Sequence, residues 1–405
     1  MADLILSVLI WAARLFGLYF AAMSIFGLGK IKPIPQSSPQ TRFAVFIPAR
    51  NEGRVIAQCV RSVLLCNYPK ELFTVFVIPN NCTDDTEKQA MGAGAEIIRC
   101  GRPVSNKGQA LRCGQEYIKG MGFDAVCVFD ADNTADPMFL SRMNDAFCHG
   151  AKVAKGRCIA SNPHDSWVSG CYAIYFGLFD LFFNRARSFL GLSARLNGTG
   201  FAISLDALEK TGGFATLSTA EDAELSGLCA LNGIKVHWVP LALCSAEHPV
   251  TFSQSLTQRS RWCGGIMQVA LIMLPRFFQK KRADFLTVDF AFFSLTPFVQ
   301  GLSVLTVVHS IASCAMLPYS KACSEFAIMA LSVFLSYIVF TAVAAFITKA
   351  CGMNLSSMTA AIICYPMFMA SWTPISFFCI FTKKNRWRVI THGLAGGKQK
   401  DPSIL

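Results

Sequence analysis

Residues 123–132 read FDAVCVFDAD, an apolar run followed by two aspartates, Asp130 and Asp132, with one residue between them. The apolar run predicts a buried β-strand, and alternate residues of an extended chain project to the same side. The two carboxylates therefore offer hard oxygen ligands at the end of a strand, where open α/β sheets bind their ligands. Oxygens of this kind suit Mg²⁺ or Mn²⁺. An ordinary Asp-rich turn would give the same pattern, so the surrounding sequence decides.

The segment from residue 42 to residue 261 alternates predicted strands and helices. Strands are expected at 43–48, 73–78, 96–99 and 123–129, and helices at 55–65, 83–93 and 107–119. Thr83, Asp84 and Asp85 are candidates to cap the second of these helices. Strands that alternate with helices of this length imply parallel crossovers and a nucleotide-binding α/β domain. The carboxyl ends of the strands are therefore the candidate site.

Polar motifs stand at these strand ends and farther along the chain. They are PARNE at 48–52, NNCTDD at 80–85, NKG at 106–108, the Asp130/Asp132 pair, NGTG at 197–200, TAED at 219–222 and QRSRW at 258–262. In this order and spacing they resemble the family 2 glycosyltransferases of the GT-A fold. The resemblance is strongest to the membrane-embedded branch that contains cellulose, chitin and hyaluronan synthases and ceramide glucosyltransferase. It covers about residues 43–262, and the series as a whole is far more specific than any one motif.

The resemblance implies how a nucleotide-sugar donor and its metal are held. The nucleobase would be cradled by Pro48, Asn51, Glu52, Asn80 and Asn81, and Asp130 would contact the nucleoside side of the donor. The diphosphate would lie beside Lys107 and Arg261, and Mg²⁺ or Mn²⁺ would be bound by Asp132, with Asp130 sharing the ion. Relatives usually carry one or two aspartates where this chain has Asn80 and Asn81, so hydrogen bonding is kept and charge is removed. Lys107 opens a helix and suits a phosphate, although a solvated surface lysine is the alternative.

The acceptor side is also implied by the resemblance. Asp222 would be the base that takes the proton of the acceptor hydroxyl, with Glu221 positioning the site. The alternative is an acidic first turn of a helix capped by Thr219. Gln258, Arg261 and Trp262 share one helix face, which suits Trp262 under an acceptor sugar; a basic interfacial helix is the alternative. The glycines of the loop that contains Asn197 and Gly198 would allow close approach to the acceptor.

The composition predicts an integral membrane protein with one large extramembrane domain. The 405 residues are 53% hydrophobic and include 34 Phe, and segment 4–28 is long enough to span a bilayer. We expect a membrane helix at 1–29, a linker at 30–41, the GT-A domain at 42–262, an interfacial helix at 263–283, membrane or interfacial helices at 284–382, and a cationic tail at 383–405. The net charge of +12 gathers at membrane edges, and no aromatic-interleaved basic motif supports nucleic-acid binding.

The membrane topology stays open at this stage. Basic clusters should face the cytoplasm, yet three full spans after a cytoplasmic domain would put the basic tail outside. A stretch interrupted by Pro297, or by Pro366 and Pro374, is the candidate for a segment that does not span. Arg14 lies deep in the first apolar segment, and Asp289 is the expected partner; snorkelling to the interface or lining a passage for the glycan are the alternatives.

The seventeen cysteines show no paired metal spacing, and their odd number favours free thiols. The sequence therefore predicts an inverting, metal-dependent glycosyltransferase that uses a nucleotide sugar, expected to be a UDP-sugar, to extend a β-linked polysaccharide. Residues 387–392 resemble the gating loop of processive synthases, or else anchor a helix end. A single transfer to a lipid acceptor stays open, and a transporter or lipid-binding protein would leave the carboxylates without a function. We expect the plasma membrane, with the catalytic domain in the cytoplasm.

Overall fold

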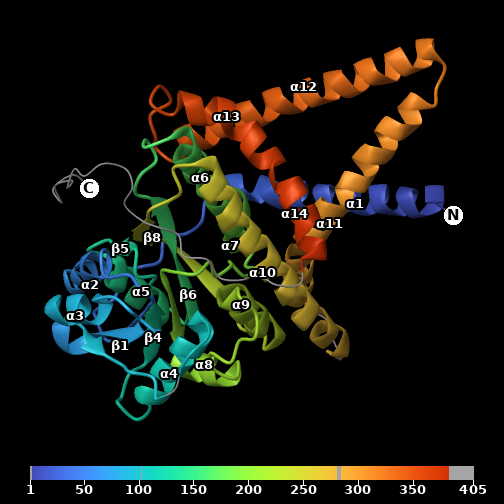
Figure 1. Cartoon of the computed structure of the whole chain (residues 1–405). Helices are drawn as coiled ribbons and strands as arrows, with labels where there is room; N and C mark the ends of the chain where they lie inside the picture. Colours follow the sequence, from blue (N-terminus) through green and yellow to red (C-terminus); the bar gives the residue numbers. More distant parts are fainter. Residues whose placement is uncertain (1, 102, 281–283, 383–405) are drawn as a thin grey trace.

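A computed structural model describes residues 2–101, 103–280 and 284–382. One α/β domain carries a set of long helices that extend away from it (Figure 1). The first helix, α1 (Ala2–Ile25), and the last helices, α11 to α14, lie together on the side away from the α/β core (Figure 1). The chain thus leaves and re-enters the long-helix region on either side of the domain that positions the candidate site.

The domain is built on one eight-stranded sheet in the order β3-β2-β1-β4-β7-β6-β8-β5. Its strands are β1 (Phe43–Ala49), β2 (Phe73–Pro79), β3 (Glu96–Ile97), β4 (Ala125–Val128), β5 (Asn133–Ala135), β6 (Val153–Ala160), β7 (Phe201–Ser204) and β8 (Val236–Ala246). The first four pair in parallel, as expected from the alternating pattern. Beyond β4 the sheet is mixed, because β7 is antiparallel to both β4 and β6, and β5 is antiparallel to β8, while β6 and β8 are parallel. The α/β fold class is confirmed, with a more mixed sheet than the parallel crossovers implied.

Helices cover both faces of this sheet. They are α2 (Ile56–Leu64), α3 (Thr86–Gly92), α4 (Lys107–Tyr117), α5 (Phe139–Cys148), α8 (Leu205–Lys210) and α9 (Glu221–Leu231), with short turns η2 (Lys70–Leu72) and η1 (Phe26–Leu28) outside them. Alternate residues of β1 project to opposite sides: Val45 and Ile47 pack with α2 and α5, whereas Ala44 and Phe46 pack with α4 and α9. Both faces of the central strands are therefore buried, as a doubly covered sheet requires.

The Asp130/Asp132 pair lies in the turn that joins β4 to β5. β4 ends at Val128, two residues before the first aspartate. Ala131 is 4% exposed and packs into the core, while both aspartates are half-buried. The strand-end position expected from sequence is thus confirmed, but turn geometry, and not the pleat of a strand, presents the two carboxylates.

Other element boundaries differ only locally from the expected ones. The helix expected at 83–93 begins at Thr86; the residue before it, Asp85, makes no capping bond, and the Asp84 carboxylate accepts from the Thr86 N–H at 3.1 Å. Farther along, α6 (Trp167–Leu178) continues through the π-helical turn η3 (Phe179–Arg185) into α7 (Ala186–Phe189). π-Turns cost stability and tend to occur at functional sites. This continuous helical segment joins the sheet domain to the long helices.

The QRSRW motif lies on a helix much longer than expected. α10 (Phe252–Gln279) runs unbroken for 28 residues through Trp262 and through the segment for which a separate interfacial helix was expected. Pro275 is accommodated in its last turns. One rigid element therefore links the candidate site to the long helices.

Among the described residues, four segments are long and apolar enough to cross a membrane: Leu6–Leu28, Phe285–Ala315, Tyr319–Ala350 and Thr359–Phe381. α11 (Phe285–Ala315) and α12 (Tyr319–Ala350) project as a helical hairpin (Figure 1). The last segment is broken at Ser371 into α13 (Thr359–Ala370) and α14 (Trp372–Phe381). These helices fit an integral membrane protein. The tail with its expected gating loop, including Trp387, lies outside the described residues, as does the basic segment 281–283.

The expected partnership of Arg14 with Asp289 is wrong. Asp289 is 5% exposed and accepts two hydrogen bonds from Arg187, at 2.8 Å from Nε and 2.7 Å from Nη2. Tyr19 also donates its hydroxyl to the Asp289 carboxylate. This network ties α1, α7 and α11 together. Arg14 is exposed instead, with its guanidinium 5.1 Å from the centroid of the Trp11 ring.

Candidate active site

The first two strand ends lie side by side and hold the residues expected to meet the nucleobase. β1 and β2 are in register from Phe43 opposite Phe73 to Ala49 opposite Pro79, and the Asn80 N–H donates to the Ala49 carbonyl at 2.8 Å. The Asn51 side chain accepts from the Thr83 N–H at 2.8 Å. The two sequence-distant motifs therefore form one edge, with Pro48 at the end of β1 and Glu52 just beyond it.

Two asparagines at this edge adopt left-handed backbone conformations. Asn51 has φ of 58° and Asn81 has φ of 51°, a region that asparagine tolerates better than most residues. The Asn81 side chain donates to the Val104 carbonyl at 2.7 Å. Asn80 is 6% exposed, and its Oδ1 has no hydrogen-bond partner among the described residues. A pocket beside them is lined in part by Pro79, Asn81 and Val104.

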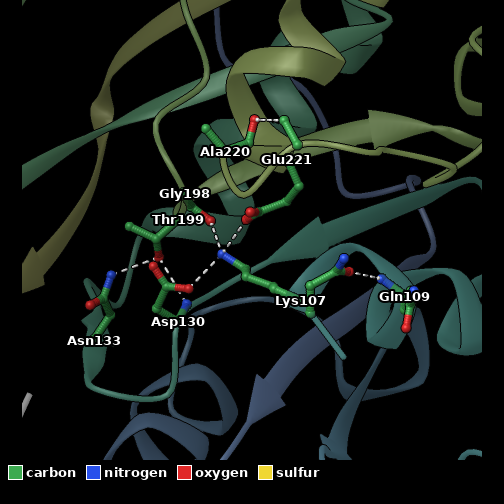
Figure 2. A network of polar contacts seen from close by, with 10 residues as sticks. Lys107, Gln109, Asp130, Asn133, Gly198, Thr199, Ala220 and Glu221 are labelled. Atoms are coloured by element: carbon green, nitrogen blue, oxygen red, sulfur yellow. Dashed lines mark hydrogen bonds and ion pairs between the residues drawn. The ribbon is translucent and has the colours of Figure 1, made fainter. Parts of the chain in front are cut away.

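Lys107 is the hub of the site (Figure 2). Its Nζ lies 2.6 Å from Asp130 Oδ1, 2.6 Å from the Gly198 carbonyl oxygen and 3.1 Å from Glu221 Oε1. Asn106 caps α4 by accepting from the Gln109 N–H, which fixes the first turn that carries Lys107. One ammonium group thus joins the β4 turn, the NGTG loop and the start of α9. The alternative of a solvated surface lysine is wrong.

The NGTG loop, which was expected beside the acceptor, lies against the acidic turn. Gly198 has φ of +71°, and a Cβ there would stand 3.2 Å from Asp130 Oδ2. Thr199 was not singled out from the sequence, yet its hydroxyl accepts from the Asp130 N–H at 3.1 Å and from the Asn133 side chain at 2.6 Å (Figure 2). The loop therefore bonds both Asp130, in the acidic turn, and Asn133, directly after the turn. Asn197 Oδ1 is buried without a hydrogen-bond partner among the described residues.

The site holds an excess of carboxylates. Burial, followed by the charges of Asp132, Asp130 and Asp84, raises the pKa of Glu52 to about 7. Burial also raises the pKa of Glu221, and Asp222 and Asp130 add to that rise while Lys107 opposes it. The pKa of Lys107 is raised by Asp130 and Glu221 against the effect of its burial. Clustered carboxylates of this kind are common where a cation or a catalytic proton is handled.

Glu221 and Asp222 begin α9, as the acidic motif predicted. Ala220 occupies the capping position without a side-chain bond, whereas Thr219 pairs with Gln268 of α10 through its N–H at 3.0 Å. The alternative interpretation had Thr219 as the cap of this helix. Thr219 does not cap it. A Cβ on Gly265 would stand 2.9 Å from the Ala220 side chain, so α10 packs directly against the start of α9. The helix that carries the QRSRW motif therefore adjoins the start of the helix that carries Glu221 and Asp222.

The residues of the QRSRW motif divide between structure and site. Arg259 is fully buried and donates to the Phe368 carbonyl at 2.8 Å and to Ser371 at 2.7 Å, which fixes α10 to the α13–α14 break. Arg261 and Trp262 are half-buried. Trp262 meets the rings of Tyr172 and Phe176 edge-on, at 5.9 Å and 6.2 Å between centroids. Gln258 Oε1 is buried without a hydrogen-bond partner in the described part of the chain.

Arg195 is a second residue that no motif indicated. Its guanidinium carbon lies 3.3 Å from the centroid of the Phe293 ring on α11. Burial lowers its pKa to about 10, with an opposing contribution from the charge of Asp222. Arg195, just before the NGTG loop, therefore anchors this loop to α11, one of the helices long and apolar enough to cross a membrane. Its position two residues before Asn197 was the only signal in the sequence.

The sheet order and the acidic turn define an α/β fold of the GT-A type. Over 90% of this chain, the structure is similar to a mannosyltransferase from Pyrobaculum calidifontis in complex with GDP-Man and Mn²⁺, with a TM-score of 0.64 and 17% sequence identity. The similarity covers 99% of that chain. Residues 39–265 match the model of the glycosyltransferase-like family 2, and the chain belongs to this family.

Curated relatives agree with the family. "Probable glycosyltransferase YdaM" of Bacillus subtilis is 30% identical over 274 residues, which are 65% of this chain and 64% of the relative. A beta-monoglucosyldiacylglycerol synthase of Synechocystis is 25% identical over 63% of this chain and 56% of its own length. Glucomannan 4-beta-mannosyltransferase 7 of Arabidopsis thaliana is 26% identical over 54% of this chain and 42% of its own length. The chain thus spans less than two thirds of the length of each relative.

Proposed function

We propose that this protein is an inverting glycosyltransferase that moves a hexosyl or N-acetylhexosaminyl group from a nucleotide sugar to an acceptor hydroxyl. The observation that carries the proposal is the Lys107 hub, which brings Asp130 and the Glu221–Asp222 pair to one ammonium group, at 2.6 Å and 3.1 Å for the first two carboxylates. Donor and acceptor chemistry need these groups within one site. The sequence placed residues 107, 130 and 221 in one site but did not predict that Lys107 pairs with both carboxylates.

A divalent cation fits the acidic turn. Glu52, Asp130 and Asp132 place three carboxylates near the turn, and the charges of the two aspartates add to the effect of burial in raising the pKa of Glu52. Carboxylate oxygens are the ligands that Mg²⁺ and Mn²⁺ prefer. Asp132, with Asp130, would hold such an ion, and the ion would supply Lewis-acid stabilisation of the leaving diphosphate. The fold neighbour from Pyrobaculum calidifontis contains Mn²⁺ and GDP-Man, which supports this assignment.

The side chains divide the remaining work. Asp222 takes the proton of the attacking hydroxyl, and the charge of Lys107 and Arg261 stabilises the diphosphate that departs. Glu221 holds Lys107 in place through the 3.1 Å ion pair. Pro48, Asn51, Asn80 and Asn81 form the edge that receives the nucleobase. In an inverting displacement the base acts on the face opposite the leaving group, so Asp222 has to approach from the acceptor side.

Two acceptor classes follow from the relatives. A glycan acceptor, and hence β-linked polysaccharide synthesis, is supported by the glucomannan mannosyltransferase. A single transfer to a lipid is supported by the diacylglycerol-glucosylating relative and by the packing of α10, which carries Trp262, against α14 and α11. We place Gln258, Trp262, Asn197 and Gly198 at the acceptor in either case. A transporter without catalysis would leave the Lys107 hub unexplained.

The test is transfer from radiolabelled donors. Membranes that contain the protein are incubated with UDP-glucose, UDP-N-acetylglucosamine or GDP-mannose, and the products are separated by size and by partition into organic solvent. We expect one donor to label either a polymer or a lipid, with the catalytic domain accessible from the cytoplasmic side of the plasma membrane. The variant Asp222→Asn should lose transfer by about 10²–10⁴-fold while it still binds the nucleotide. Labelling in none of these reactions, or full activity of Asp222→Asn, would contradict the proposal.

A further inference from the structure

His248 lies at the edge of the candidate site, although no sequence motif pointed to it. It follows β8, whose last residue, Ala246, pairs with Asn133 in the antiparallel ladder. Asn133 comes directly after the acidic turn and bonds the Thr199 hydroxyl at 2.6 Å. The chain at His248 therefore runs close to the turn that carries Asp130 and Asp132.

The imidazole of His248 is held in one orientation. Asn162 clamps its backbone, donating to the His248 carbonyl and accepting from its N–H, both at 2.9 Å. The ring stacks on Tyr172 and Phe176 with centroid distances of 5.0 Å and 4.9 Å and interplanar angles of 10° and 16°. Trp262 meets these same two rings edge-on. His248 and Trp262 thus share one aromatic support.

This well-fixed ring has an unused polar atom. His248 is 6% exposed, and its Nε2 has no hydrogen-bond partner among the described residues. Burial lowers its pKa to about 4, so the imidazole is neutral at pH 7. Leaving a buried polar atom unpaired costs about 1–3 kcal/mol. Gln258 Oε1 and Asn197 Oδ1, on two residues placed at the acceptor, are buried and unpaired in the same sense. Unused hydrogen-bonding atoms beside aromatic faces are typical of a site for a polar ligand.

We propose that His248 contacts the acceptor and selects an uncharged, hydroxyl-bearing group. The inference rests on the transfer function proposed above. The half-buried ring of Trp262 suits the apolar face of a sugar ring or the carbon chain of a glycerol head group, and Nε2 of His248 would pair with one of the acceptor's hydroxyls. A neutral imidazole forms no ion pair with a phosphate, so it does not favour a charged acceptor over a hydroxyl. Glycosyl and glyceryl acceptors share this chemistry, so both are tested.

The test compares His248→Phe with the control His237→Phe. Phe keeps the ring stack and removes the polar atoms, and His237 lies on the same strand system but outside the site. Transfer is measured with radiolabelled donor to diacylglycerol in mixed micelles, to a β-linked oligosaccharide and to a polyprenyl phosphate. We expect His248→Phe to raise the acceptor KM about tenfold, the value of one hydrogen bond. Donor hydrolysis without acceptor and UDP binding should stay unchanged, and His237→Phe should match the wild type.

Different results contradict different parts of the proposal. A wild type that transfers to none of the acceptors contradicts the transferase function, and the role of His248 with it. A wild-type acceptor KM in His248→Phe contradicts the role of His248 alone, and preferred transfer to the polyprenyl phosphate contradicts selection of an uncharged acceptor. If His248→Phe does not fold, His248→Gln decides, because it retains a hydrogen-bonding group. Acceptors that each lack one hydroxyl are then compared in the wild type and in His248→Gln. At one hydroxyl position the loss of acceptor affinity should be larger in the wild type than in His248→Gln.

Discussion

Two clusters of charged side chains, one around Lys107 and one around Arg187, differ in how their positive and negative charges are balanced. At the sheet edge one ammonium group, Lys107, serves Asp130 and Glu221, with Glu52 and Asp132 also close enough to act on one another. At the junction of the long helices one guanidinium, Arg187, forms a bidentate pair with one carboxylate, Asp289, and Tyr19 adds a hydroxyl. The first group has carboxylates to spare, and the second has none.

This difference separates a site from a scaffold. An excess of buried carboxylates destabilises the fold unless a cation or a ligand relieves it, so it marks a place where something binds. A matched bidentate pair leaves no charge for a ligand and instead joins three helices that are distant in the sequence. The two groups should therefore respond to mutation in opposite ways, activity being lost at the first and stability at the second.

The largest effect is expected for Asp132→Asn. Removing a metal ligand and its charge should lower metal-stimulated transfer and donor hydrolysis together by about 10²–10⁴-fold, the several kcal/mol that a Lewis acid supplies. The unfolding free energy should not fall, because the edge has carboxylates to spare. Transfer is measured against the concentration of Mn²⁺ and Mg²⁺, and Asp206→Asn, at an exposed ion pair with Lys210, is the control. Full activity of Asp132→Asn, or of the wild type in EDTA, would remove the metal from the acidic turn.

The next effect is on stability at the second group. Asp289→Asn leaves the buried Arg187 without its counter-charge, so we expect the unfolding free energy to fall by about 3–5 kcal/mol. Thermal unfolding of the detergent-solubilised chain measures this loss. The double variant Arg187→Met/Asp289→Leu should recover much of it, because apolar side chains replace a matched pair at little cost. Glu325→Gln, an exposed carboxylate on another long helix, should change nothing, and an equally stable Asp289→Asn would show that the pair does not hold the helices.

Sequence patterns predicted one of these groups much better than the other. The strand-end position of Asp130 and Asp132 and the place of Lys107 at the start of a helix follow from local periodicity and from the rule that parallel strands end at one edge, whereas the loop with Gly198 was placed beside the acceptor by the family resemblance. Neither local periodicity nor the strand-end rule predicts that these residues converge on Lys107. The partner of Asp289 was predicted wrongly because both candidate cations, Arg14 and Arg187, lie in apolar surroundings far away in the sequence, and hydrophobicity does not say which helix faces which.

The residues that escaped prediction share a physical reason. His248 lies two residues beyond Ala246, which pairs with Asn133 because β5 is antiparallel to β8, and Thr199 reaches Asp130 because β7 is antiparallel to β4. These pairings join strands far apart in sequence, and the alternating strand and helix pattern predicted only the parallel part of the sheet. Arg195 depends on the packing of its loop against Phe293 of α11. Contacts between the domain and the long helices leave no periodic signal in either partner.

A smaller effect is expected from the titration of Glu52. Its pKa is raised to about 7 in the folded chain from 4.5, so the folded state holds a proton that the unfolded state releases between these values. The unfolding free energy should therefore fall as pH rises from about 4.5 to 7, by about 1–3 kcal/mol for this residue. Glu52→Gln should remove that part of the pH dependence, and thermal unfolding at a series of pH values without divalent metal measures it. Identical pH dependence in the variant and the wild type would mean that neither burial nor the neighbouring carboxylates raise the pKa of Glu52 in the folded chain.

The smallest effect is expected for Arg14→Leu, and it sharpens the comparison because Arg14 and Arg187 are cations of the same region. A cation in mid-bilayer costs about 2.5–3.5 kcal/mol on insertion scales when nothing pairs with it. Arg187 is buried and paired with Asp289, whereas Arg14 is exposed on α1 beside Trp11, where its long side chain can reach an interface. Arg14→Leu should therefore leave the unfolding free energy within about 0.5 kcal/mol of the wild type, as surface substitutions do, while Arg187→Leu should lose as much as Asp289→Asn. Shorter or trapped product from a stable Arg14→Leu would instead show that Arg14 lines a passage for a glycan. A lower unfolding free energy of Arg14→Leu would show that a partner of Arg14 in the membrane stabilises the fold about as much as Asp289 does.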